Sequence, residues 1–199
     1  MKDEIIIGLS DGKEGETDFI PLITSEDEEQ FDAEKTPSEL SILPLRNTVL
    51  FPGVVIPITV GRDKSIKLIQ EAKKKKTLFG VVSQKDPELE DPNREDLYNV
   101  GTVAQILRLL KMPDGTTTAI IQGKKRFKLD EVIQEEPYMK AKVIELTEKR
   151  YSKSHAEMKA TVDSMKEVAQ EIIDLSPNIP SEAGFAIKNI ESYGFLVNF

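Results

Sequence analysis

Few residues in this chain could do chemistry. There is one histidine, His155, and no cysteine, which excludes a thiol nucleophile and a thiolate zinc site. A Ser–His–Asp site needs an imidazole held beside a nucleophile, but His155 falls at the polar start of a predicted helix, where a solvated side chain is expected. Neither a GxxxxGK(S/T) nor a GxGxxG sequence is present, so no phosphate-binding loop of either kind is predicted. We therefore assign no catalytic, cofactor-binding or metal-binding residue to these 199 residues.

Carboxylates gather in one stretch, at Asp86, Glu88, Glu90 and Asp91. Their oxygens would suit a hard cation, but the alternating ligands and the turn glycine of a calcium loop are missing. With a single histidine and no cysteine, a transition-metal site is not indicated either. The pattern favours a solvated acidic loop.

Two basic clusters raise the question of nucleic acid: Lys73–Lys76, and Lys124–Arg126 followed by Phe127 and Lys128. A nucleic-acid surface combines a basic stripe with stacking aromatic rings, and here only Phe127 offers a ring. The net charge of −8 also opposes attraction of a polyanion. The pattern favours a helix end and a strand edge kept soluble by lysine, and nucleic acid is not an expected partner.

Acidic residues are concentrated at the start of the chain. Residues 1–40 hold 13 of the 35 acidic residues and 3 of the 27 basic ones. Because like charges repel and apolar residues are scarce, residues 1–39 are predicted to form an acidic, disordered arm of unassigned role. Its apolar segments Ile5–Leu9 and Phe19–Ile23 are either docking segments or incidental. No apolar run reaches the roughly 18 residues of a membrane span, and no secretory signal is recognised, so no membrane is expected as a partner.

Residues 40–150 carry a largely β pattern. Residues 41–61 are rich in β-branched side chains and are interrupted by Pro44, Pro52 and Pro57, which favours short strands at an edge or a bend. Residues 62–76 have helical apolar spacing and end in four lysines, which suit a helix C-terminus. Further strands are predicted at 78–83, 100–112, 116–122, 127–133 and 139–146, with a tight turn at Asp114-Gly115. The predicted fold class is α+β, with a small, partly closed β-barrel and one short helix.

Residues 151–199 are predicted to form a helical subdomain. One apolar seam runs through Met158, Val162, Met165, Ala169 and Ile172, and we expect it to be core within the domain rather than an oligomer contact. A second helix is expected to begin at a Ser181 cap and run to about Ser192. The last residues, YGFLVNF, are apolar, and we infer that the helical part continues in a longer parent protein.

The segment 42–70, ILPLRNTVLFPGVVIPITVGRDKSIKLIQ, resembles the start of the N-terminal domain of the Lon ATP-dependent proteases. The family pattern PLR-x-x-V-x-FP-x-x-x-x-P-x-x-VGR-x-x-S is matched by Pro44, Leu45, Arg46, Val49, Phe51, Pro52, Pro57, Val60, Gly61, Arg62 and Ser65. The stretches 81–86, 96–116 and 123–128 resemble the same family in the same order. The resemblance therefore covers residues from about 40 to about 195, and nothing is carried over to the acidic arm.

The resemblance implies a fold and a function. Residues 40–150 would form the family's PUA-like pseudo-barrel, and residues 151–199 the helical subdomain that precedes an AAA+ ATPase and a Ser–Lys peptidase. The parent would be a cytoplasmic homohexamer that uses ATP and Mg to degrade misfolded and short-lived regulatory proteins. This part would recognise unfolded or degron-bearing substrates and help to assemble the ring, without catalysis of its own.

Recognition of unfolded chains needs exposed, adaptable apolar surface. Two places offer candidates for substrate binding: Phe51, Pro52 and Val54 at a predicted bend, and Met112 and Pro113 at a predicted hairpin tip. Methionine is unbranched and suits variable partners. Packing at the bend is the favoured alternative for Phe51, whereas both interpretations stay open for Met112. Arg46 and Arg62 are expected to pair with buried carboxylates or carbonyls.

Two other functions remain open from the sequence alone. The first is a stand-alone protein-binding adaptor that has the same domain and no ATPase. The second is an RNA-binding module on a PUA-like fold, which would show affinity that falls steeply with salt.

Overall fold

The computed structural model describes residues 6–9, 18–21, 30–31, 33–112, 116–147, 155–179 and 182–199. The chain divides into two compact units. The barrel unit comprises residues 30–147 with residue 198, and the helical unit comprises residues 1–29, 148–197 and 199. We describe each unit by itself.

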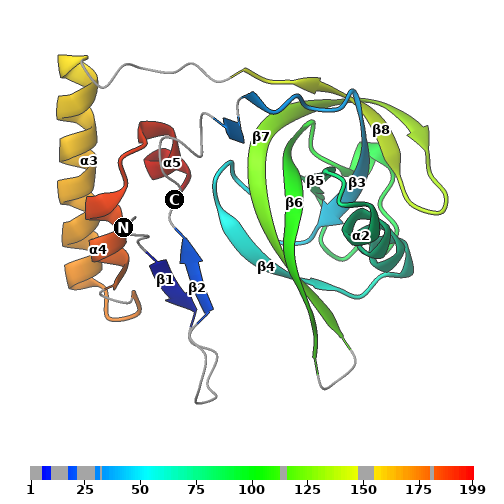
Figure 1. Ribbon diagram of the computed structural model, residues 1–199, viewed down its shortest axis with the longest axis horizontal. Coiled ribbons are helices and arrows are strands. Elements are labelled where there is room, and N and C mark those ends of the chain that lie inside the picture. The colour runs from blue at the N-terminus through cyan, green and yellow to red at the C-terminus, as the bar shows by residue number, and fades with distance from the viewer. Residues whose placement is uncertain are drawn as a thin grey trace. The chain divides into compact units, whose positions relative to one another are not determined.

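Six strands form the barrel unit (Figure 1). In sheet order β4-β7-β6-β5-β3-β8 they are Val55–Val60, Thr117–Gln134, Val100–Lys111, Phe79–Ser83, Glu39–Leu45 and Lys140–Glu145. Because β7 also pairs with β8, five of these strands close into a ring, and β4 is attached to it through β7. Strands β3 and β5 run parallel, and the other pairs are antiparallel. The prediction of a sheet combined with helices is confirmed.

Strand β7, Thr117–Gln134, is one continuous strand, whereas the sequence predicted two strands at 116–122 and 127–133. Its first part pairs with β4 and its last part pairs with β8, while β6 pairs with it from Thr117 to Lys128. The polar run Gly123–Arg126 resembles a connection in the sequence but stays in the ladder, because β6 continues beside it. The prediction of two strands is therefore wrong at this point, and the single strand is what closes the ring.

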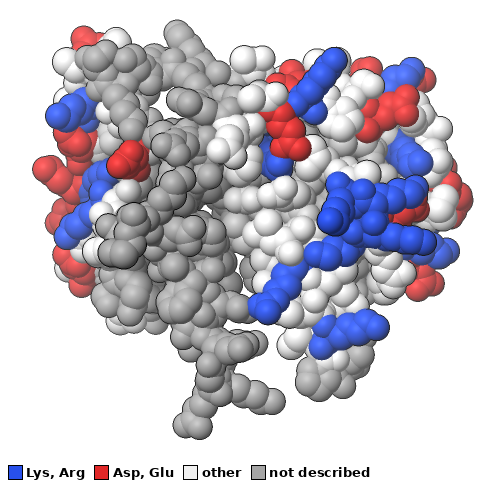
Figure 2. Space-filling view, in the orientation of Figure 1, with Lys and Arg blue, Asp and Glu red and all other residues white. Residues whose placement is uncertain are grey.

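Helix α2, Asp63–Lys75, agrees within one residue at each end with the predicted helix 62–76. It buries one face, made up of Ser65, Leu68, Ile69 and Ala72. It ends at Lys76, which is left-handed (φ 52°) and whose N–H reaches the carbonyls of the last turn. Basic side chains gather at the place of this helix in the space-filling view (Figure 2). One short 3-10 turn, Arg94–Asp96, follows in the acidic stretch.

The barrel interior holds two apolar clusters. Phe79 belongs to the first and Phe127 to the second, and both rings are fully buried. Leu97 and Ile121 are equally inaccessible. Burial of rings of this size is the main favourable contribution to holding the ring of strands together.

The helical unit contains β1 (Ile6–Leu9), β2 (Asp18–Pro21), α3 (Ala156–Leu175), α4 (Glu182–Asn189) and α5 (Tyr193–Asn198). Strands β1 and β2 pair with each other in an antiparallel ladder. The sequence predicted a disordered arm over residues 1–39, but these two segments are its apolar parts and can satisfy each other's backbone groups. Among the described residues, no helix has both the length and the hydropathy needed to span a membrane.

The expected second helix is shorter than predicted. Helix α4 ends at Asn189, and Ser192 begins a separate helix, α5, by accepting a hydrogen bond from the N–H of Phe195 at 3.0 Å. Serine at a helix start satisfies an otherwise unpaired amide. The sequence prediction of one helix up to Ser192 missed this second cap, and the predicted cap residue Ser181 lies outside the described residues.

The predicted seam on α3 is only partly core. Val162 is buried, whereas Met165 and Ile172 are exposed and Ile173 is buried instead. Helix α4 packs on α3, but its 8 residues extend about 12 Å against about 30 Å for α3. A partner this short leaves much of a long helix uncovered, so the expectation that the whole seam is internal core is wrong.

Replacement of Phe127 tests the importance of the core. Phe127→Ala should lower the free energy of unfolding by about 3–5 kcal/mol, because a fully buried ring is replaced by a cavity. Urea unfolding of the 199-residue chain measures this change. Tyr98→Ala is the matched control, because this ring is 53% exposed and its loss should change stability by less than about 0.5 kcal/mol. Equal losses for the two variants would contradict the assignment of Phe127 to the core.

Candidate functional site

A tight turn lies between β3 and β4, at Phe51–Val54. Pro52 occupies its second position and Gly53 its third, with φ at 84°. The N–H of Val54 donates to the carbonyl of Phe51 at 3.2 Å. Proline followed by a residue with positive φ is typical of a type II turn, so Pro52 and Gly53 shape the backbone of this bend.

The turn is fixed to β7 at Gly123. The N–H of Gly53 donates to the carbonyl of Gly123 at 2.9 Å, and the N–H of Gly123 donates to the carbonyl of Val54 at 3.0 Å. A Cβ atom on Gly123 would lie 2.3 Å from the carbonyl oxygen of Phe51. Only glycine allows this close approach, so the position of the turn depends on Gly123.

The turn holds an aromatic ring at the surface. The Phe51 side chain is 40% exposed, and the guanidinium of Arg126 lies 5.9 Å from its ring centroid, a cation–π distance. Val49 is 57% exposed, while Leu50 between them is buried. Val54 packs partly against the core. Of the bend residues predicted from the sequence to bind substrate, Phe51 is thus the most exposed. Val49 is also exposed, but it was not among the predicted substrate-binding residues.

Met112 lies far from this turn. It is exposed at the end of β6, where its N–H donates to the carbonyl of Thr116 at 2.9 Å. Thr116 and Gly123 are seven residues apart along the β7 segment, which corresponds to about 23 Å. The structure therefore does not bring Met112 and Phe51 together. Pro113, the other predicted contact residue at the hairpin, lies outside the described residues.

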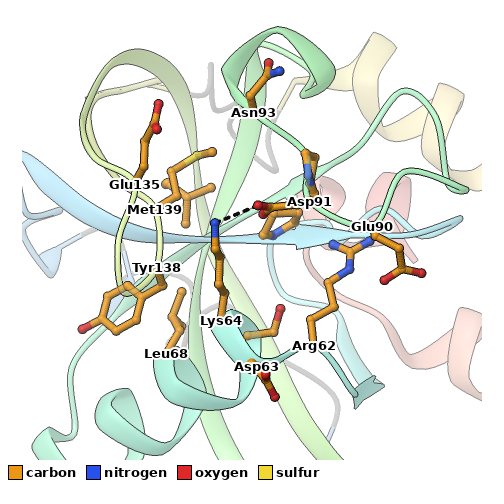
Figure 3. A pocket seen from close by; sticks show the side chains of 14 residues that line it. Arg62, Asp63, Lys64, Leu68, Glu90, Asp91, Asn93, Glu135, Tyr138 and Met139 are labelled. Carbon is orange, nitrogen blue, oxygen red and sulfur yellow. Dashed lines mark hydrogen bonds and ion pairs between the residues drawn. The ribbon is translucent and has the colours of Figure 1, made fainter.

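Two adjoining hollows open beside the first turn of α2; Figure 3 shows the first. The first hollow has a volume of about 310 Å³ and the second about 490 Å³. They share the lining residues Pro44, Arg62, Ser65 and Glu90. Both volumes fall in the range of about 300–1,000 Å³ that is usual for ligand sites.

The first hollow has an apolar floor and a charged rim. The floor consists of Ile42, Leu68, Tyr138 and Met139. At the rim, the Lys64 ammonium pairs with Asp91 (dashed line in Figure 3) at 2.9 Å and with Glu136 at 2.9 Å. Hydrogen bonds to these two carboxylates raise the pKa of Lys64, so the amine is charged at neutral pH. Burial and then a hydrogen bond to Glu71 at 2.6 Å raise the pKa of Tyr138, so the phenol stays a donor.

Arg62 stands between the two hollows and holds the β5–β6 connection in place. Its guanidinium donates to Oε1 of Gln84 at 2.7 Å and to the carbonyl of Leu89 at 3.1 Å. Burial and the neighbouring Arg46 lower the pKa of Arg62. Arg46 pairs with Glu90 at 3.0 Å. The expected carbonyl partner of Arg62 is therefore found, but the carboxylate that pairs with Arg46 is exposed rather than buried.

The chain segment that lines the second hollow continues into the exposed turn. Thr48 lines this hollow, and its carbonyl accepts a hydrogen bond from Oγ of Ser83 at 2.5 Å. The next residue is Val49, and Phe51 follows two positions later. One continuous segment thus forms a wall of the hollow and then presents two exposed apolar side chains. We call the second hollow together with Val49 and Phe51 the apolar site.

In the described part of the chain, no group of three metal-ligating side chains comes together. His155 forms the N-cap of α3, where its Nδ1 accepts from the N–H of Met158 at 3.4 Å. The arrangement around α2 and the turn offers apolar contact area and anchoring charges, which is the chemistry of binding a polypeptide.

Comparison with known proteins identifies the family. The profile described as the ATP-dependent protease La (LON) substrate-binding domain matches residues 39–199. The chain belongs to this family.

Relatives and a solved structure agree with the Lon family assignment. The Lon protease of Flavobacterium johnsoniae is 60% identical over 186 residues, which cover 94% of this chain and 23% of that protein. The Lon protease of Cytophaga hutchinsonii is 52% identical over 182 residues, or 92% of this chain and 22% of that protein. The N-terminal domain of Mycobacterium avium complex Lon protease has a TM-score of 0.60 at 20% identity, with 80% of each chain covered, and shows the same fold. The chain thus spans about a quarter of the length of these curated relatives.

The residues that carried the Lon resemblance converge on the apolar site. Pro44, Arg62 and Ser65 line both hollows. Leu45, Arg46, Pro57, Val60 and Gly61 line the second hollow. The remaining motif residues, Val49, Phe51 and Pro52, form the exposed segment. The motif residues therefore lie around one site. From the sequence alone they were only a series of backbone-shaping and apolar positions.

The close contact at Gly123 can be tested by adding a single methyl group. Gly123→Ala should lower the free energy of unfolding by about 1–3 kcal/mol, because the new Cβ meets the backbone of Phe51 and forces the turn away. Urea unfolding gives the loss in stability, and the amide chemical shift of Gly53 reports the displaced turn.

Gly61→Ala is the matched control, because nothing lies within 4 Å of the added Cβ there. It should leave both readouts nearly unchanged. A Gly123→Ala variant as stable as Gly61→Ala, with an unshifted Gly53 amide, would contradict the docking of the turn on β7.

Proposed function

We propose that the barrel unit binds unfolded segments of protein substrates through the apolar site. The observation that carries the proposal is the pair of exposed side chains, Val49 and Phe51, on a segment whose backbone is fixed at both ends. Unfolded chains expose the apolar side chains that native proteins bury, so an apolar surface favours them over folded proteins.

The second hollow supports this proposal by its size. Its volume of about 490 Å³ suits one or two apolar side chains of an extended chain. Its rim includes Arg46 and Arg62, whose positions are fixed by the β5–β6 connection. A preformed surface of this kind loses little conformational entropy on binding, which favours affinity.

The division of the chain into three parts is also part of this proposal. Residues 40–150 form a PUA-like pseudo-barrel, residues 151–199 form a helical subdomain, and residues 1–39 form an acidic arm. The ring closed by β7 and β8 supports the barrel assignment.

The activity of the whole protein is likewise a proposal. The relatives are named Lon proteases and extend well beyond the matched region. We propose that the parent is a cytoplasmic, homohexameric, ATP-dependent serine protease for misfolded and short-lived regulatory proteins. ATP and Mg would be bound, and peptides cleaved by a Ser–Lys dyad, in parts outside these 199 residues. This chain itself would bind substrate and support ring assembly without catalysis.

The two alternative functions receive less support. The naming of the relatives as proteases favours a part of a larger enzyme over a stand-alone adaptor. The basic cluster at Lys124 and Lys125 is unsuited to RNA, because these side chains are only 9% and 11% exposed and pair with Glu34 and Glu145.

A double substitution tests the proposed function. The combined Val49→Ser and Phe51→Ser variant should bind a fluorescent, unfolded peptide of leucine, phenylalanine, serine and asparagine about tenfold more weakly, because partial burial of each apolar side chain is lost. Fluorescence anisotropy with the 199-residue chain measures the affinity.

Tyr98→Ser is the matched control, because this ring is as exposed as the two test residues but lies outside the apolar site. It should bind like the unchanged chain. Unaltered affinity of the double variant, or equal affinity of the chain for a natively folded protein, would overturn the proposal.

A further inference from the structure

A second surface of the barrel unit is strongly basic. The stretches 67–76 and 105–112 hold seven basic residues and a single acidic one, Glu71. Blue side chains gather over the end of α2 in the space-filling view (Figure 2). We call five of the exposed basic residues of this surface the lysine face: Lys73, Lys74, Lys76, Arg108 and Lys111.

The end of α2 places several charges close together. Lys75 pairs with Glu71 four residues earlier, so the one acid of the surface is already engaged. Lys76 caps the helix in the left-handed conformation, with φ at 52°. Glycine is the residue that this conformation favours. A lysine here adds a charge at some expense of backbone stability.

A β-bulge places an apolar side chain among these charges. On β6 the register shifts between Ile106 and Arg108, so that Leu107 is the extra residue of the bulge. A bulge turns a side chain out of the regular alternation, and Leu107 is 41% exposed. Its carbonyl accepts a hydrogen bond from the Lys73 ammonium at 3.4 Å, which joins the helix end to β6. The lysine face thus contains an apolar contact point bordered by cations.

The other basic cluster shows the contrast. The ammonium groups of Lys124 and Lys125 pair with Glu34 and Glu145 and are largely covered. Lys73, Lys74 and Lys76 are exposed. Of these two clusters, which the sequence could not distinguish, the lysines at the end of α2 are more exposed than Lys124 and Lys125.

We propose that the lysine face binds acidic unfolded segments that carry an apolar residue, and so gives the domain a preference for acidic substrates. This inference rests on the proposed function and names a substrate class for it. Carboxylates of such a segment complement the lysines, while one apolar side chain contacts Leu107. Electrostatic complementarity of this kind mainly speeds association and selects among partners.

A nucleic acid fits the surface less well. Binding of single strands relies on aromatic rings that stack with the bases, and the stretches 67–76 and 105–112 contain none. An exposed leucine offers a base little, whereas it suits an apolar side chain of a polypeptide. The acidic polypeptide is therefore the occupant that uses both features of the surface.

The experiment compares two fluorescent, unfolded peptides with the same leucines, one with aspartate and glutamate and one with serine and asparagine at the other positions. The variant Lys73→Gln/Lys74→Gln/Lys76→Gln should bind the acidic peptide about tenfold more weakly at low salt, and the loss should shrink at high salt. Its affinity for the neutral peptide should stay unchanged. Leu107→Ser should weaken binding of the acidic peptide by about fivefold.

The matched control is Lys128→Gln/Lys159→Gln/Lys188→Gln, which removes the same charge from exposed positions outside the lysine face. It should leave both affinities unchanged. A control that weakens acidic binding as much as the test variant would overturn the proposal, as would equal affinity of the unchanged chain for both peptides. Displacement of the acidic peptide by a single-stranded oligonucleotide at lower concentration than by the unlabelled peptide would also overturn it.

The two proposals fail in distinguishable ways. Loss of neutral-peptide binding in the Val49→Ser/Phe51→Ser variant supports the apolar site and does not test the lysine face. If the unchanged chain bound the acidic peptide through its lysines but did not bind the neutral peptide, the lysine face would be supported and the apolar site would be rejected.

Discussion

Strand β7 pairs with three other strands, and the surfaces described above depend on this pairing. Its last part closes the ring with β8, its first part carries β4, and β6 pairs with it from Thr117 to Lys128. Near the point where β7 changes partner lies Gly123, whose missing side chain leaves room for the backbone of Phe51. The same backbone geometry that closes the barrel therefore fixes the exposed turn.

We propose that the barrel unit combines two kinds of recognition on one scaffold. The apolar site offers side chains and a hollow held by Arg62 and its hydrogen bonds to the β5–β6 connection. The lysine face offers charge around one leucine, which a bulge on β6 exposes. Apolar contacts select unfolded chains from folded ones, and charge selects among unfolded chains. A domain with both could rank substrates without contacting any one sequence specifically.

Sequence periodicity predicted the bounds of some elements well, but it did not predict which strands pair or which side chains are exposed. Helix α2 was predicted within one residue at each end, because its apolar spacing and terminal lysines are local signals. Gly123–Arg126 looked like a connection because these four residues are polar and carry no local signal of their pairing with β6. The exposure of Ile172 depends on how little of α3 the short α4 covers, which no local pattern states. Phe51 was selected as an apolar residue at a predicted bend, but its closeness to the second hollow required the fold.

Mapping of crosslinks tests the central claim most directly. An unfolded, photoreactive model substrate is crosslinked to the 199-residue chain, and the adducts are located by mass spectrometry. The account predicts adducts concentrated between residues 44 and 62, around Phe51 and the second hollow. Adducts confined to α3, with none on the barrel unit, would contradict it.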